Sequence, residues 1–260
     1  MQENTATRLG FAVAIAQSAG HNILNYFQQS NFHVEQKKDT TPVTEADKTT
    51  ELILRTQIME AFPEDAILGE EFPSKEGTSG YRWILDPIDG TKSFIHGVPL
   101  FGTLIAVELN GECVIGVIRI PALDEMVFAA KGNGAWYVHG ETNPVPAHVS
   151  QTETLEEATV LTTSDRTYAR VGCPEAWQKI TEATQLTRMW GDCYGYLLVA
   201  TGRVDAMVDP EMSIWDVAAL YPIIQEAGGQ ISAWSGAVDH TASNTVASNG
   251  LLHEQLLALL

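Results

Sequence analysis

The chain has 260 residues, of which 45% are hydrophobic and 18% charged, and it carries a formal net charge of −18 at pH 7. This length and composition predict a globular protein with a sizeable core and exclude a disordered chain. The negative charge argues against nucleic acid and anionic membranes as partners, because both would repel the protein.

The first third of the chain predicts two helices. Apolar residues recur at helical spacing over residues 8–28 and again over 44–62, where Thr44 is placed to cap the second helix. The polar stretch 37–42 between them is predicted to be loop or extended chain. Residues 9–19 are apolar enough to resemble a short signal peptide, but the pattern continues amphipathically, which favours a helix that faces the core.

The middle of the chain predicts a largely antiparallel sheet. Short β-prone runs follow one another there, and Asn110-Gly111 is typical of a tight hairpin turn. The predicted strands are 66–68, 81–85, 101–108, 113–120, 125–130 and 134–138.

From residue 150 the pattern changes to alternating strands and helices. Strands are predicted at 159–162, 204–208 and 229–234, and helices at 174–183, 194–202 and 214–227. The change near 144–152 predicts two halves of one compact unit, an α+β half of residues 1–148 and an α/β half of residues 149–260. Helices covering sheets in layers would follow from this order.

The three cysteines, Cys113, Cys173 and Cys193, are far apart in the sequence and lack Cys-x-x-Cys spacing. They suit a reducing compartment better than a disulfide framework or a zinc site. No run of the sequence is long and apolar enough for a transmembrane helix. A cytoplasmic location is therefore expected.

The most informative stretch carries four carboxylates around an apolar run. Glu70 and Glu71 precede it, and Asp86 and Asp89 follow it within Asp-Pro-Ile-Asp-Gly-Thr, residues 86–91. Crowded carboxylates repel one another unless a proton or a cation neutralises them, and hard oxygen ligands suit Mg²⁺. The Gly-Thr step adds backbone amides for an anion. Metal and phosphate in one segment predict phosphoester chemistry.

Two further aspartates are ambiguous by themselves. Asp47 lies in the first turn of the second predicted helix, where an acidic side chain is stabilised by the helix dipole. Asp216 follows Trp215 at the head of an apolar helix, where an aspartate is usually a cap.

Together these motifs resemble the inositol monophosphatase-like, magnesium-dependent phosphatases. The resemblance extends over nearly the whole chain and rests on Val43–Asp47, Gly69–Glu71, Asp86–Thr91, Gly132–Ala135, Ala200–Gly202, Trp215–Asp216 and Glu226–Gly229. It implies an α/β (α+β) fold, a layered α-β-α-β-α sandwich of the inositol monophosphatase and fructose-1,6-bisphosphatase type. It also implies a homodimer and inhibition by lithium.

The resemblance implies a role for each matched residue. Two or three Mg²⁺ ions would be held by Glu70, Asp86, the carbonyl of Ile88, Asp89 and, from the other half, Asp216. Asp47 would lie outside these ligands or bind a weaker third ion. The amides of Gly90 and Thr91 would bind the phosphate. The Thr91 hydroxyl, with Glu70 and Asp47, would orient a metal-activated water for attack, without a covalent intermediate.

Residues 188–196 and 208–212 look like the histidinol-phosphate phosphatase branch of this family. Histidinol phosphate carries an ammonium and an imidazole, so its pocket needs carboxylates, whereas inositol is a neutral polyol. Three acids are candidates for the cationic end: Asp192, Asp209 and Glu211. Arg188 is a further candidate for the substrate site, or it pairs with one of these acids and is structural only. The alternative is that Asp192 caps a helix and that Glu211 lies exposed on the surface.

The expected reaction is hydrolysis of L-histidinol phosphate to L-histidinol and phosphate, a step of histidine biosynthesis. The alternative is an inositol-1-phosphate phosphatase or a phosphatase of broad specificity for small phosphate esters. Fructose bisphosphate and nucleotide 3′-phosphates are less favoured, because only 15 Lys and Arg are present and no basic cluster for a second phosphate is evident. A sensor that binds metal or ligand without catalysis is the remaining interpretation.

Overall fold

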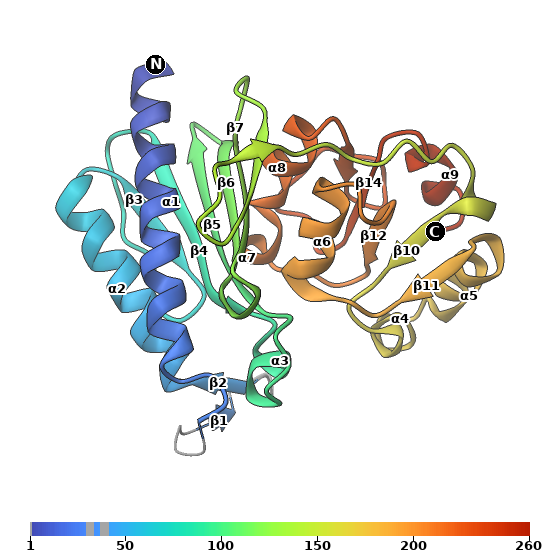
Figure 1. Ribbon diagram of the computed structural model, residues 1–260, viewed down its shortest axis with the longest axis horizontal. Coiled ribbons are helices and arrows are strands. Elements are labelled where there is room, and N and C mark those ends of the chain that lie inside the picture. Colours follow the sequence, from blue (N-terminus) through green and yellow to red (C-terminus); the bar gives the residue numbers. More distant parts are fainter. Residues whose placement is uncertain (1, 30–33, 37–41) are drawn as a thin grey trace.

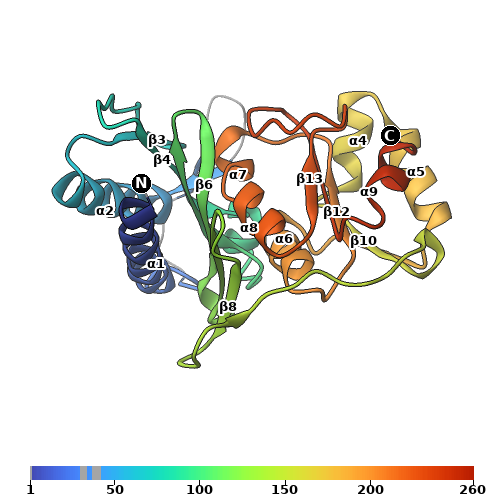
Figure 2. The ribbon, with the colours of Figure 1, turned by 90° about the horizontal axis from the view of Figure 1, so that it is seen from above.

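A computed structural model describes residues 2–29, 34–36 and 42–260. Helices and two mixed sheets alternate in layers, so the expected α-β-α-β-α sandwich is confirmed (Figures 1 and 2). In Figure 1 the layers follow one another from left to right, beginning with α1 and α2 and ending with α4, α5 and α9. The two sheets therefore face each other across a shared layer of helices.

The first sheet has seven strands in chain order, β3 to β9. Its strands are β3 (Ala66–Gly69), β4 (Tyr81–Asp89), β5 (Gly102–Leu109), β6 (Glu112–Ile120), β7 (Glu125–Ala130), β8 (Ala135–His139) and β9 (Val145–Pro146). Pairing is antiparallel throughout except between β3 and β4, which run parallel. Asn110 and Gly111 have φ angles of 52° and 90° in the predicted hairpin between β5 and β6, as a tight turn of this kind requires.

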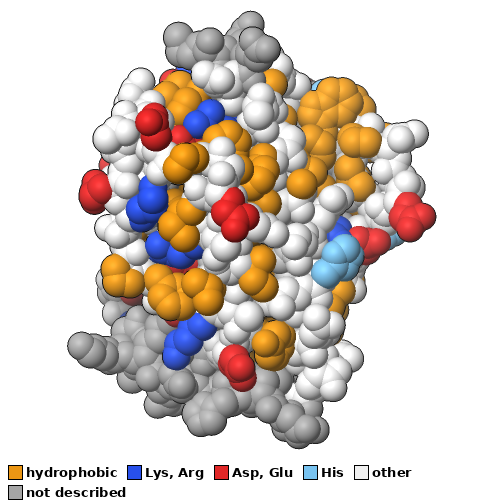
Figure 3. Space-filling view, turned by 90° about the vertical axis from the view of Figure 1, so that its left-hand side faces the viewer, with side chains coloured by type: hydrophobic (Ala, Val, Ile, Leu, Met, Phe, Trp, Pro, Cys, Tyr) orange, Lys and Arg blue, Asp and Glu red, His pale blue; other side chains and the backbone are white. Residues whose placement is uncertain are grey.

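Helices α1 (Gln2–Leu24) and α2 (Glu45–Ala61) cover the outer face of this sheet. The predicted 8–28 helix ends earlier, because the chain turns at Asn25 and Gln28 takes a φ of 58°. Thr44 caps α2 as predicted. In Figure 3 apolar and charged side chains are interspersed over this outer face, where Leu52 of α2 is 55% exposed.

A small two-stranded sheet precedes α2. Strands β1 (Val34–Gln36) and β2 (Pro42–Thr44) pair antiparallel, so the end of the stretch predicted as loop or extended chain is extended. Residues 37–41 of that prediction lie outside the described residues.

The layer between the two large sheets contains α6 (Asp192–Ala200), α7 (Ile214–Val217) and α8 (Leu220–Glu226). A single helix at 214–227 was predicted, but the helix is interrupted between α7 and α8. Pro222 lacks the N–H that would continue the hydrogen bonding of α7. Gly116 of β6 accommodates the break, since a Cβ there would lie 2.0 Å from the carbonyl oxygen of Ala219.

The second sheet has five strands in the order β11-β10-β12-β14-β13. These are β10 (Thr159–Leu161), β11 (Leu186–Arg188), β12 (Ala206–Asp209), β13 (Gln230–Ser232) and β14 (Thr245–Ser248), and their outer helices are α4 (Asp165–Val171), α5 (Pro174–Ala183) and α9 (His253–Leu257). The sequence did not predict α4, β11, β14 or α9. All four have at most seven residues, so an apolar period repeats only once or twice within each of them.

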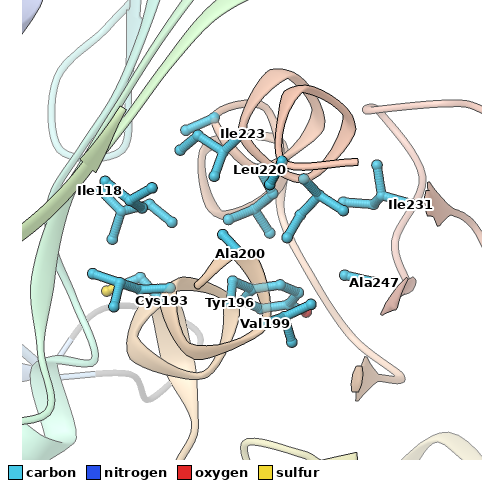
Figure 4. Close-up of a cluster of buried hydrophobic side chains, with 14 of the residues drawn as sticks. Ile118, Cys193, Tyr196, Val199, Ala200, Leu220, Ile223, Ile231 and Ala247 are labelled. Carbon is cyan, nitrogen blue, oxygen red and sulfur yellow. The ribbon is translucent and has the colours of Figure 1, made fainter. Parts of the chain in front are cut away.

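The largest hydrophobic cluster lies between the two sheets (Figure 4). Ile118 of the first sheet and Ala247 of the second are joined there by Tyr196 of α6 and Leu220 of α8. This cluster combines residues of both predicted halves, and the division at 148/149 stays a prediction. All three cysteines are free thiols. Within the described ranges, no helix is long and apolar enough to cross a membrane.

Candidate active site

The Asp86–Thr91 motif forms the end of β4 and the turn into α3 (Thr91–Ile95). The register of β4 against β5 shifts between Asp86 and Asp89, so the strand bends where the carboxylates are. Gly90 follows with a φ of 80°, a conformation that disfavours side chains. The Thr91 hydroxyl donates to the carbonyl oxygen of Ile88 at 3.1 Å, which closes the turn.

A third carboxylate reaches this turn from α7. Carboxylate oxygens of Asp86, Asp89 and Asp216 lie within 4.8 Å of one another. Asp216 is also part of a capping box, because its Oδ2 accepts from the backbone N–H of Ser213 at 2.7 Å. The two interpretations of Asp216, cap and member of a metal site, are therefore compatible.

The cluster is electrostatically unfavourable for three anions. Asp86 is 2% exposed, and its Oδ1 has no hydrogen-bond partner among the described residues. Burial, then Glu70 and its aspartate neighbours, raise the pKa of Asp86 well above its usual value. Burial and Asp192 do the same to the pKa of Asp89, and burial raises the pKa of Asp216 to about 6. An orphaned acceptor among converging carboxylates fits a hard divalent cation such as Mg²⁺.

Asp47 and Glu70 lie beside this cluster. Asp47 is 1% exposed, and its Oδ2 accepts from the backbone N–H and the hydroxyl of Thr44 at 2.8 and 2.6 Å. Burial raises the pKa of Asp47 to about 6, and the charge of Glu70 contributes. Among the described residues, the group of three or more carboxylates within 4.8 Å of one another consists of Asp86, Asp89 and Asp216, without Asp47 or Glu70. Glu70 joins them in lining one cavity of about 390 Å³.

That cavity contains the predicted metal and phosphate residues together. Its walls include Glu70, Asp86, Ile88, Asp89, Gly90, Thr91 and Asp216. A second cavity, of about 340 Å³, shares Asp89 and Asp216 with it and extends toward the five-stranded sheet. Because the two cavities share walls, a phosphate ester has room for its phosphate in one and its organic part in the other.

Asp192 lines both cavities. The N-cap of α6 is Gly191, so the interpretation of Asp192 as a helix cap is wrong. Asp192 has a φ of 53°, and its N–H donates to the hydroxyl of Thr163 at 3.0 Å. Its carboxylate lies against Gly90, where a Cβ would be 3.0 Å from Oδ2. Burial and Asp209 raise the pKa of Asp192 to about 7.

The other predicted substrate residues differ in their surroundings. Asp209 is buried in the wall of the second cavity, where its carboxylate accepts from the hydroxyls of Thr162, Thr163 and Tyr196 and the N–H of Thr163. Glu211 is exposed at the same cavity, as its surface alternative required, and forms an ion pair with Arg170. Arg188 lies outside the walls of both cavities and donates to the carbonyl oxygen of Thr187 at 2.7 Å.

Sequence reasoning missed the basic residues of the second cavity. Lys92, Arg166 and Arg170 all line it, among five acidic residues. The expectation that no basic cluster binds a second phosphate stays a prediction. Both arginines belong to α4, which was not predicted. A signal was present: Ser164 precedes α4 and Gly172 follows it with a φ of 87°, which is a usual pair of helix boundaries.

The fold and the converging carboxylates define a magnesium-dependent phosphomonoesterase of layered α/β type. The model of the inositol monophosphatase family matches residues 4–260, and the chain belongs to this family. It is 43% identical over 221 residues to a histidinol-phosphatase of Chlorobaculum parvum, covering 85% of this chain and 83% of that protein. It is 37% identical to a histidinol-phosphatase of Mycobacterium tuberculosis, covering 97% of each. The solved structure of an IMPase from Thermotoga maritima superposes with a TM-score of 0.86 at 31% identity, covering 97% of this chain and 96% of that one.

Proposed function

We propose that this phosphatase hydrolyses L-histidinol phosphate to L-histidinol and phosphate. The observation that carries the proposal is the place of Asp192, an acidic side chain next to the phosphate-binding turn and on the walls of both cavities. An ester whose organic part is cationic would gain from that carboxylate, while a neutral polyol would not. The two histidinol-phosphatases at 43% and 37% identity support the same substrate.

Magnesium would be held by Asp86, Asp89 and Asp216, with Glu70 and the carbonyl oxygen of Ile88 completing the ligands. When bound, Mg²⁺ supplies positive charge for the phosphate oxygens and lowers the pKa of a coordinated water. The three aspartates would then remain ionised at neutral pH in spite of their burial. Two or three ions, and inhibition by lithium, stay predictions.

The chain itself would bind and orient the phosphate. Gly90 and Thr91 line the cavity at a turn whose positive φ no bulky side chain would favour, and their amides would bind the phosphate. The Thr91 hydroxyl, with Glu70 and Asp47, would orient the attacking water. Asp47 lines neither cavity, so it would act on this water from beside Glu70, whose charge contributes to its raised pKa.

The cationic part of the substrate would occupy the second cavity. Asp192 would contact the ammonium group next to the ester, and Glu211 the imidazole farther out. Asp209 would contribute negative potential, while its four hydrogen bonds hold Thr163 and Tyr196 in the cavity wall. The substrate would have to compete with Arg170 for Glu211.

A second candidate substrate is a phosphate ester with a further anionic group. Lys92, Arg166 and Arg170 on the walls of the second cavity favour it, because guanidinium groups bind phosphate and carboxylate strongly. Inositol 1-phosphate remains the neutral alternative. These three classes differ in the charge of the organic part, so one assay separates them.

The test is phosphate release with Mg²⁺ from L-histidinol phosphate, inositol 1-phosphate and fructose 1,6-bisphosphate, using wild type and Asp192→Asn. Asp165→Asn, on the exposed start of α4, is the matched control. We expect kcat/KM to favour histidinol phosphate and to fall at least about tenfold in Asp192→Asn, the loss expected when a charged hydrogen-bond partner is removed. A preference for either other ester, unaffected by the substitution, would reject the substrate and leave the phosphatase.

The family resemblance also supports a homodimer. Light scattering at assay concentration, with and without Mg²⁺, measures the mass directly. A mass of one 28.3 kDa chain under both conditions would contradict it.

A further inference from the structure

The face of α2 that packs on the first sheet carries ionisable side chains where a core helix normally has apolar ones. Asp47, Glu51 and Arg55 follow at intervals of four residues, so they share one face of the helix, and all three are buried. Charged groups are costly to bury unless hydrogen bonds and ion pairs compensate. The partners of these side chains therefore indicate their role.

Glu51 and Arg55 hold the chain segment that follows Glu70. Glu51 is 0% exposed, its Oε2 accepts from the N–H of Glu71 at 2.7 Å, and its Oε1 from the N–H of Phe72 at 3.3 Å. Oε1 also accepts from Arg55 Nε at 2.6 Å. The two terminal nitrogens of Arg55 donate to the carbonyl oxygens of Phe72 and Pro73 at 2.9 and 3.0 Å.

The same carboxylate touches the chain on the other side of Glu70. A Cβ on Gly69 would lie 2.1 Å from Glu51 Oε1, so only glycine fits at this position. The N–H of Glu70 itself donates to the carbonyl oxygen of Leu85 at 3.2 Å, one residue before Asp86. The backbone of Glu70 is thus fixed between α2 and the strand that carries the aspartates.

We propose that Glu51 is a positioning residue, which sets the place of the Glu70 carboxylate for Mg²⁺ through the amides of Glu71 and Phe72. Arg55 completes the arrangement by neutralising Glu51 and holding the carbonyl groups of the same segment. This inference rests on the proposed function, in which Glu70 is a magnesium ligand. It explains why α2 buries a charged pair instead of apolar side chains.

Glu51→Gln is the most informative variant, because it keeps the shape and removes one acceptor. Both oxygens of Glu51 accept from N–H groups, so a glutamine must turn its own NH₂ toward a donor. We expect Mg²⁺ affinity, measured by titration calorimetry on the full chain, to fall about 10- to 100-fold, as for other partners behind a metal ligand. Thermal unfolding in EDTA measures the structural effect separately.

Glu226→Gln is the matched control. Its carboxylate also accepts from two loop amides, those of Gly132 and Gly134, each at 2.7 Å, but that loop lies outside both cavities. We expect Mg²⁺ affinity to stay within twofold of wild type. An equal loss in both variants would show that loosening any loop weakens the site, and would overturn the proposal.

A second variant covers the case in which Glu51→Gln does not fold. Glu51→Asp keeps the charge opposite Arg55 but is one methylene shorter, so it cannot hold both amides; we expect a several-fold loss of Mg²⁺ affinity. Wild-type affinity in a folded Glu51 variant would overturn the positioning role alone. Glu70→Gln tests the proposal on which this one rests, that Glu70 is a Mg²⁺ ligand. Unchanged Mg²⁺ binding in that variant would refute both the ligand role of Glu70 and the positioning role of Glu51.

Discussion

Two regions of the molecule bury aspartates equally well but differ in the hydrogen-bond donors that surround the carboxylates. Asp65, between α1 and the first sheet, is 1% exposed and accepts hydrogen bonds from Arg8, Ser79 and Trp83. Asp86, at the end of β4, is 2% exposed and has one oxygen without a hydrogen-bond partner among the described residues. Burial favours a higher pKa at both positions. The pKa of Asp86 is raised, whereas the donors around Asp65 outweigh burial and lower its pKa.

The difference teaches that burial by itself does not identify a functional carboxylate. A structural one is surrounded by donors that the fold supplies, whereas a ligand is surrounded by other acids and needs a cation from outside. Asp209 lines a cavity but resembles the first kind in its partners, since protein donors occupy its oxygens, while burial still raises its pKa. Asp47 is intermediate, with two donors from Thr44 and an acidic neighbour in Glu70.

The largest effect is expected for Asp86→Asn, which should lower kcat at least about 100-fold, because loss of a metal ligand costs more than loss of a partner behind one. The metal-free protein should be no less stable, since its surroundings favour the neutral acid that asparagine resembles. Phosphate release and urea unfolding in EDTA measure the two quantities. Wild-type kcat, or a large loss of stability in EDTA, would place Asp86 with the structural aspartates.

Asp65→Asn should do the reverse. It leaves the buried guanidinium of Arg8 without its anion, which costs about 3–5 kcal/mol of unfolding free energy. The remaining folded protein should keep its Mg²⁺ affinity and kcat, because Asp65 lines neither cavity. Urea unfolding measures the loss, and Asp239→Asn on the surface is a control expected to cost less than about 0.5 kcal/mol. A stability equal to wild type would refute the role of the ion pair.

Most of the first sheet, its covering helix α2 and the metal motif could be predicted from the sequence, because they rest on local patterns. Apolar periodicity located α2, short β-prone runs located β3 to β8, and Thr44 marked the helix start. The aspartates at 86 and 89 are three residues apart, so one turn brings them together. Asp216 was matched to them by family resemblance, since nothing local indicates that a residue 127 positions beyond Asp89 returns to the same turn.

What the sequence could not show are the partners of each carboxylate. The donors to Asp209 come from 13 to 47 positions away and from different elements. Its hydrogen bonds in the cavity wall therefore form only when these elements pack together. The basic residues of the second cavity were missed for the same reason. Arg166 and Arg170 line the same cavity as Lys92 only after α4 has packed, and α4 is a helix too short to predict by periodicity.

His253 extends the comparison to a base, because its neutral form is the one whose hydrogen bonds are complete. Ser232 donates to the carbonyl oxygen of Ala233 and so accepts from the ring Nε2–H at 2.8 Å. The ring Nδ1 then accepts from the Ser248 hydroxyl at 3.0 Å. Burial lowers the pKa of His253 from its usual 6.5, against a smaller opposite effect of Glu254.

The native state therefore binds this proton less readily than the unfolded chain. The contribution of His253 to the free energy of unfolding is complete above pH 6.5, its pKa in the unfolded chain. This contribution is lost as the pH falls from there toward the lower native pKa, with a slope of at most about 1.4 kcal/mol per pH unit. Urea unfolding between pH 7.5 and 5, at fixed salt, should show this slope in the difference between wild type and His253→Gln, because the raised pKa values of Asp47, Asp192 and Asp216 affect both proteins alike. Parallel pH profiles would mean that the histidine titrates alike in both states.

The smallest effect is expected at the intermediate case, Asp47. Thr44→Val removes the hydroxyl that donates to Asp47 and accepts from the N–H of Ala46, and it leaves the shape of the side chain nearly unchanged. We expect a loss of about 1 kcal/mol of unfolding free energy, as for other helix caps. Because Asp47 would have one donor fewer beside Glu70, the stabilisation of the protein by saturating Mg²⁺ should increase slightly relative to wild type. Unfolding with and without Mg²⁺ measures both quantities. If saturating Mg²⁺ adds the same unfolding free energy to the variant as to wild type, Asp47 belongs with the structural carboxylates.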